Sequence, residues 1–208
     1  MAIKPILFNS EMVRAILERR KGATRRSVKG YIPDDAVWGY TAFTPKGYIS
    51  CRGTFADGYG EKFFKLPCEP GDILYVRETW KKALNGYYYY EAWQRNDIAD
   101  VTKWKSPVCM PKEASRIWLK VKNVRVERLQ KITEDGCIAE GVYPSNCRGC
   151  NATFGCDNCP DECYNEIDEF SEIWDSTVKK SDLDRYGWDA NPWVFVYEFE
   201  HCEKPKEE

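Results

Sequence analysis

One segment of this 208-residue chain alternates between apolar and polar residues more clearly than any other. From Arg116 to Val126, apolar side chains occupy every second position, with a single slip at Asn123. Alternation places every second side chain on one face of a strand, and one slip is typical of a β-bulge. The segment therefore predicts a half-buried strand that contains a bulge.

Four other segments have the composition of strands. Lys4 to Phe8 predicts a short first strand, and a Pro-Gly-Asp turn leads into a second at Ile73 to Trp80. A third is predicted at Tyr87 to Trp93. Trp193 to Phe199 has the β-branched and aromatic content of a closing core strand.

Three segments show helical periodicity instead. Glu11 to Arg20 and Ile167 to Val178 carry apolar residues at helical spacing. Ile132 to Gly141 begins with a Thr cap and acidic residues and ends at a glycine, as a short helix does. Tyr31 to Lys65 is rich in glycine, proline and aromatic residues without periodicity, which favours irregular loops and short hairpin strands.

Composition bounds the possible partners. A hydrophobic fraction of 43% supports one domain over residues 1–208, with an insertion at 143–164. The net charge of −2 gives no overall positive field, so nucleic acid would contact only a local patch. No segment approaches the roughly 20 apolar residues that span a bilayer, and the N-terminus has no apolar export signal. We therefore expect a soluble cytoplasmic protein without a membrane partner.

Half of the ten cysteines lie in one short segment: Cys147, Cys150, Cys156, Cys159 and Cys163. Paired C-x-x-C spacing directs two thiolates at one metal, and four thiolates favour a tetrahedral zinc ion. The alternatives are an iron–sulfur cluster and free or disulfide-paired thiols. The five other cysteines are scattered and are expected to be plain buried thiols.

The ligand set leaves two alternatives. One uses the first four cysteines of the segment, and the other replaces Cys156 by Cys163. Four protein ligands leave no open position, and His201 is the only histidine, so we expect a structural rather than a hydrolytic zinc.

The order of motifs resembles the ASCH family. A K-x-x-T-R-R turn at Lys21 to Arg26 precedes a G-D-x-L-x-V-R-E strand at Gly71 to Glu78. The long alternating strand, an I-T-E-x-x-x-x-x-E-G helix and an aromatic closing strand follow in order. The ending from Tyr186 to Trp193 resembles a branch common among bacteriophages and prophages. The resemblance implies an α+β fold: a PUA-like mixed β-barrel with flanking helices, here with a small zinc-binding insertion.

The resemblance also implies a cleft beside the first helix for RNA, DNA or a modified nucleoside. In some members a Lys, a Thr and a Glu remove the acyl group from N4-acylated cytidine, roles that fall by motif on Lys21, Thr24 and Glu140. A lysine with a lowered pKa would activate the Thr hydroxyl, and the Glu would act as an acid. However, an ionised Glu140 beside Lys21 would raise the pKa of that lysine and weaken it as a base.

Three functions therefore remain open. The first is a binding module in which Lys21, Arg25 and Arg26 contact phosphates and an aromatic residue such as Trp80 or Tyr75 stacks on a base. The second is the amidohydrolase, and the third is a phage assembly or interaction protein. If these residues have only a structural role, the basic turn is solvated or forms an ion pair with Glu140.

The predicted strand that ends at Trp80 also carries two adjacent charged residues near its end. Arg77 and Glu78 are expected in the cleft, or alternatively as an ordinary internal ion pair.

Overall fold

The computed structural model describes residues 1–96, 103–143 and 165–205. It confirms the predicted α+β class, with most of its regular structure in strands. Ten strands form three sheets in these ranges: β1 (Ile3–Leu7), β2 (Ala23–Ser27), β3 (Val37–Gly39), β4 (Tyr48–Phe55), β5 (Gly58–Lys65), β6 (Ile73–Arg77), β7 (Trp80–Ala83), β8 (Gly86–Tyr89), β9 (Trp118–Arg128) and β10 (Trp193–His201).

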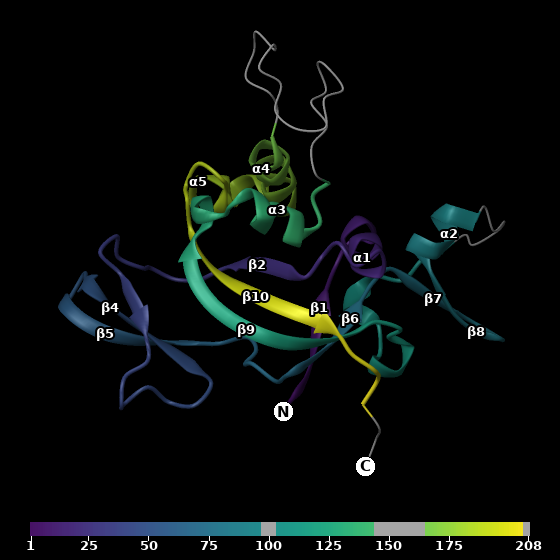
Figure 1. Cartoon of the computed structure of the whole chain (residues 1–208), viewed down its shortest axis with the longest axis horizontal. Helices are drawn as coiled ribbons and strands as arrows, with labels where there is room; N and C mark the ends of the chain where they lie inside the picture. The colour runs from purple at the N-terminus through teal and green to yellow at the C-terminus, as the bar shows by residue number, and fades with distance from the viewer. Residues whose placement is uncertain (97–102, 144–164, 206–208) are drawn as a thin grey trace, which may run out of the picture.

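The central sheet has the strand order β1-β6-β9-β10-β2. β1 pairs with β6 in parallel, and the other neighbours are antiparallel. β1 and β2 are the two edges, so the described backbone pairing leaves this sheet open. β9 curves strongly through the centre of the molecule (Figure 1).

The predicted bulge in the alternating strand is confirmed. Asn123 pairs with Glu198, whereas the next pair towards the N-terminus of β9 joins Val121 to Phe199. Lys122 is thus the extra residue opposite that step. The extra residue returns Val124 to the buried face that also holds Val121.

β10 is buried on both faces, which explains its nearly continuous apolar composition. Phe195, Tyr197 and Phe199 belong to the larger core cluster with the first helix and the other central strands. Val194 and Val196 belong to a second cluster with two later helices. The predicted closing core strand is therefore confirmed, and it separates two cores.

Five α-helices in the described ranges cover or flank the sheets: α1 (Ser10–Leu17), α2 (Tyr90–Asn96), α3 (Glu134–Glu140), α4 (Glu166–Thr177) and α5 (Leu183–Tyr186). α3, α4 and α5 lie together over one side of the central sheet, and α1 lies near one end of β2 (Figure 1). The three predicted helices are confirmed, although α1 is shorter than expected and stops at Leu17. None of these helices is long and apolar enough to cross a bilayer.

The segment from Tyr31 to Lys65 is more regular than predicted. β4 and β5 are eight-residue strands that pair along their whole length, and β3 adds a short third strand. Figure 1 shows this sheet projecting to one side of the central one. β5 is largely exposed, so its sequence has no buried face to create a clear alternation.

The strand predicted over Tyr87 to Trp93 is wrong in its second half. The strand ends at Tyr89, and α2 begins at Tyr90. Glu91 in the first turn of α2 is buried and lies 3.2 Å from Arg116. Strand propensity depends on the local sequence, so it does not detect this long-range ion pair.

Candidate functional site

The turn between α1 and β2 closes the C-terminal end of α3. The last carbonyls of a helix have no partner within it. Here the Gly22 amide donates to the Ala139 carbonyl at 2.8 Å, and Lys21 Nζ donates to the Glu140 carbonyl at 2.7 Å. Arg20 donates to the Gly141 carbonyl. The basic turn therefore caps the negative end of the α3 dipole.

Local sequence signals set the position of Glu140. The Thr133 hydroxyl accepts a hydrogen bond from the Gly136 amide and begins α3, and Gly141 ends it with a φ of 104°. A Cβ on Gly141 would lie 2.8 Å from the Ala15 Cβ. Glycine at this position thus allows both the left-handed turn and the close approach of α1.

Glu140 is the centre of a buried ion-pair cluster. Its carboxylate oxygens lie 2.6 Å from Lys21 Nζ and 3.2 Å from Arg25 Nη1, and Arg25 also pairs with Glu127 at 2.8 Å. Lys21 and Arg25 are only 2% and 3% exposed, and Glu140 is 9% exposed. Two cations and two carboxylates balance in charge, which makes burial of this cluster tolerable.

The pKa of Lys21 is lowered. Burial is the largest cause, and the positive charges of Arg26 and Arg25 act in the same direction. The charge and hydrogen bond of Glu140 raise the pKa but do not outweigh burial. The sequence-based concern that Glu140 would raise the Lys21 pKa is thus correct in sign, but burial has the larger effect.

Thr24 places an unpartnered hydroxyl in the same region. The residue is 1% exposed and lies on β2, three residues after Lys21. Its Oγ1 has no hydrogen-bond partner among the described residues. A buried hydroxyl without a partner costs about 1–3 kcal/mol, so its persistence calls for a reason such as a ligand.

These residues border a pocket of about 520 Å³ between β2 and α4. Thr24, Arg25 and Glu140 line it on the side of the ion-pair cluster. Lys21 is in the layer behind, where it contacts Glu140 without lining the pocket. The structure therefore brings Lys21, Thr24, Arg25 and Glu140 together at this side of the pocket.

The pocket also contains cations that sequence reasoning partly missed. Arg26 was expected there, whereas Lys29 and Lys179 were not. None of the three forms an ion pair within the described ranges. Of the acidic lining residues, Glu140 is already neutralised by its partners, which leaves Asp182. The pocket is therefore electropositive.

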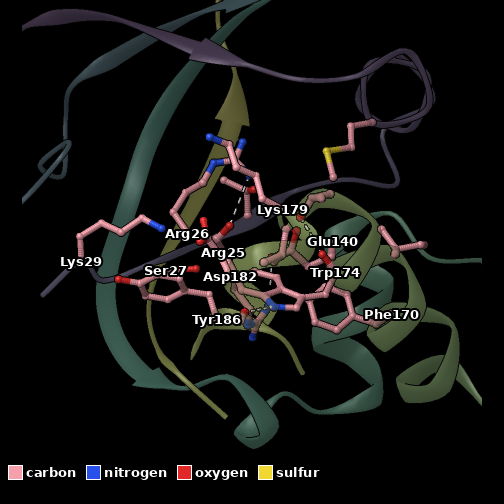
Figure 2. A pocket seen from close by; sticks show the side chains of 15 residues that line it. Arg25, Arg26, Ser27, Lys29, Glu140, Phe170, Trp174, Lys179, Asp182 and Tyr186 are labelled. Carbon is pink, nitrogen blue, oxygen red and sulfur yellow. Dashed lines mark hydrogen bonds and ion pairs between the residues drawn. The ribbon is translucent and has the colours of Figure 1, made fainter. Parts of the chain in front are cut away.

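Three aromatic rings line the pocket as well. Phe170 and Trp174 come from α4 and Tyr186 from α5. Figure 2 shows these rings along one side, with Arg26 and Lys179 across from them. Phe170 and Trp174 also belong to the second core cluster, and their i, i+4 spacing in the predicted helix indicates only that burial.

The other predicted cleft residues lie elsewhere and do not line this pocket. Glu78 is buried and pairs with Arg116 through two contacts of 2.9 Å, and Arg77 instead donates to the Val108 carbonyl. Trp80 is buried in a separate small cluster with Met110. Glu78 thus forms an internal ion pair, but not with Arg77.

The clustered cysteines 147, 150, 156, 159 and 163 lie outside the described residues, so zinc binding stays a prediction. The described part of the chain contains no group of three metal-ligating side chains. Cys51, Cys68 and Cys137 are buried thiols as expected, whereas Cys109 is exposed. His201 Nε2 lies 2.8 Å from the Ile16 carbonyl.

Comparisons of this chain with family models, with curated proteins and with solved structures find no match. The likeness to the ASCH family therefore rests on the motifs alone.

Proposed function

We propose that this protein binds nucleotide units, either free modified nucleotides or those of a nucleic acid, in the pocket between β2 and α4. One observation carries the proposal: three cations without an acidic partner in the described structure face the same pocket as three aromatic rings. The cations can bind the phosphate groups of a nucleotide, and the aromatic rings can stack on its base. A pocket of about 520 Å³ has the size of known small-ligand sites.

Two hydroxyl groups in the pocket can form hydrogen bonds with a nucleotide. Thr24 and Ser27 lie on β2 among the lining residues. Each hydroxyl can donate to or accept from a base edge or a sugar. Glu140 is less suited to this role, because Lys21 and Arg25 already occupy its two carboxylate oxygens.

Titration calorimetry tests this proposal with a panel of nucleoside monophosphates and short RNA and DNA strands. We expect Lys29→Met and Lys179→Met to weaken binding and to reduce its dependence on salt, because each removes one phosphate contact. Lys46→Met is the matched control, since Lys46 is an exposed lysine that does not line the pocket. Absence of binding across the whole panel would reject the proposal and favour a protein-interaction role.

We infer further that the fold is PUA-like and of the ASCH type. The order of the strand and helix motifs and the strong curvature of β9 support this (Figure 1). The zinc-binding insertion at 143–164, the phage or prophage origin and the cytoplasmic location belong to the same inference.

A second candidate is the deacylation of N4-acylated cytidine. The lowered pKa of Lys21 and the unpartnered Thr24 hydroxyl favour it specifically. Thr24 Oγ would attack the acyl carbon, the C–N bond would break as the cytosine nitrogen gains a proton, and water would hydrolyse the acyl-threonine ester. The products are cytidine and a carboxylic acid.

Chromatography of the products tests this second activity. Incubation with N4-acetylcytidine should release cytidine in the wild-type protein and none in Thr24→Val, which keeps the shape of the side chain and removes only the nucleophile. Release that persists in Thr24→Val would exclude Thr24 as the nucleophile. No release by the wild-type protein would leave binding as the function.

A further inference from the structure

Arg26 lies between two pockets. The site pocket adjoins a second pocket of about 430 Å³, and Met12, Arg26 and Thr177 line both of them. Arg26 belongs to the edge strand β2, and the second pocket extends from it towards β1 and β6. A ligand that occupies the site pocket can therefore continue past Arg26.

The second pocket differs in character from the first. Its walls are largely aliphatic and include Ile6, Leu7, Pro67 and Leu74. One polar group stands out: Tyr197 is 2% exposed, and its hydroxyl has no hydrogen-bond partner among the described residues. Burial raises the pKa of Tyr197, so the phenol stays protonated and can donate. Lys4 and Asn9 also line the pocket, which thus suits a flat ring that carries an acceptor for Tyr197 and further polar groups at its edge.

Arg26 lies at the junction without a direct ion-pair partner among the described residues. Its guanidinium donates to the Leu7 carbonyl at 2.9 Å and makes a long contact of 3.4 Å with the Arg25 carbonyl. Neither partner is an acid, and the nearby Glu140, whose charge also acts on Arg26, already pairs with Lys21 and Arg25. Several of its five donors remain for an anionic group of a ligand.

We infer that the ligand is a phosphodiester-linked strand that occupies both pockets. This rests on the proposed function and identifies the class of ligand. An anion on Arg26 with a substituent in each flanking pocket is a phosphate diester, whereas a monoester has one substituent and leaves the second pocket empty. One nucleotide lies in the site pocket, the linking phosphate contacts Arg26, and the neighbouring base enters the second pocket, where Tyr197 donates to it.

Calorimetry of the full chain with mononucleotides and dinucleotides tests this inference. Matched ribonucleoside and deoxyribonucleoside 5′-monophosphates and their 3′,5′-linked dinucleotides separate RNA from DNA as the source. We expect dinucleotides to bind about tenfold more tightly than mononucleotides, because the second pocket adds a base contact. Equal affinity would overturn this inference and leave the proposed function intact, whereas no binding of either would overturn both.

Three variants test whether the second pocket accounts for the tighter binding of dinucleotides. Pro67→Trp fills the second pocket from an exposed position and should reduce dinucleotide affinity to that of a mononucleotide, whose own binding is unchanged. Pro45→Trp, also exposed but outside both pockets, is the control. Tyr197→Phe removes only the unpartnered hydroxyl and should weaken dinucleotides about fivefold. Equal losses for mononucleotides and dinucleotides in Pro67→Trp would overturn the inference.

Discussion

Lys21 Nζ donates to both the side chain and the backbone carbonyl of Glu140, at 2.6 and 2.7 Å. One side chain therefore closes the end of α3 and neutralises the carboxylate that borders the pocket. Stability and site geometry depend on the same contact. Substitutions around this pair should separate the two roles.

Removing the charge of Glu140 should strongly destabilise the protein. Glu140→Gln leaves Lys21 as a buried cation without a carboxylate, so the free energy of unfolding should fall by about 3 kcal/mol. Glu200→Gln, which disrupts an exposed pair with Lys122, should change it by less than about 1 kcal/mol. Urea denaturation measures both, and equal effects would contradict a stabilising role for the buried pair.

Lys21 should make stability depend on alkaline pH. Burial lowers its pKa in the folded state below the ordinary 10.5, so in the interval between these pKa values the unfolded chain binds more protons than the folded chain. The contribution of Lys21 to the free energy of unfolding therefore rises with pH across this interval and is constant below it. The free energy of unfolding of the wild type minus that of Lys21→Met should therefore increase from pH 7 towards pH 10. A difference that is constant or falls would contradict a lowered pKa.

Two threonines should respond differently to the same substitution. Thr24→Val should leave the free energy of unfolding within about 0.5 kcal/mol of wild type or raise it, because the buried hydroxyl has no partner to lose. Thr133→Val removes the N-cap of α3 and should lower it by about 1 kcal/mol. Thermal or urea unfolding gives both values. A large loss in Thr24→Val would show that the hydroxyl is satisfied in the folded protein.

Gly141 should tolerate substitution less well than Gly58. Both have a positive φ, 104° and 110°, but a Cβ on Gly58 meets nothing within 4 Å, whereas one on Gly141 meets the Ala15 Cβ at 2.8 Å. Gly58→Ala should lower the free energy of unfolding by about 1–2 kcal/mol through backbone strain alone. Gly141→Ala should lose a further 1–3 kcal/mol or so through overpacking. Similar losses in the two variants would indicate that α1 and α3 can move apart.

Zinc should be bound by the cysteine segment in a one-to-one ratio. Metal analysis of protein purified under reducing conditions should find zinc, and Cys147→Ser should abolish its binding. Comparison of Cys156→Ser with Cys163→Ser distinguishes the two ligand sets. Zinc binding should be lost only in the variant whose replaced cysteine is a ligand. Iron in place of zinc, or retention of zinc in Cys147→Ser, would contradict the prediction.

Local features of the sequence were sufficient to predict several elements. The alternation with its slip at Asn123 predicted β9 and its bulge, and the Thr cap and glycine predicted α3 with Glu140 at its end. Caps, bulges and alternation act between neighbouring residues, so one sequence can reveal them. The strands β4 and β5 were not placed, because β5 is largely exposed and β4 begins with three consecutive buried residues, Ile49 to Cys51, which break the alternation.

The tertiary structure decided the geometry and most of the partners of the charged groups. The motif resemblance grouped Lys21 with Glu140, but their contact spans 119 residues, and its geometry and the balance of burial against charge required the fold. Glu78 pairs with Arg116 rather than with its neighbour Arg77. Lys179 joined the pocket without any sequence signal. Sequence periodicity reports which face of an element is apolar, whereas packing of distant elements determines what that face meets.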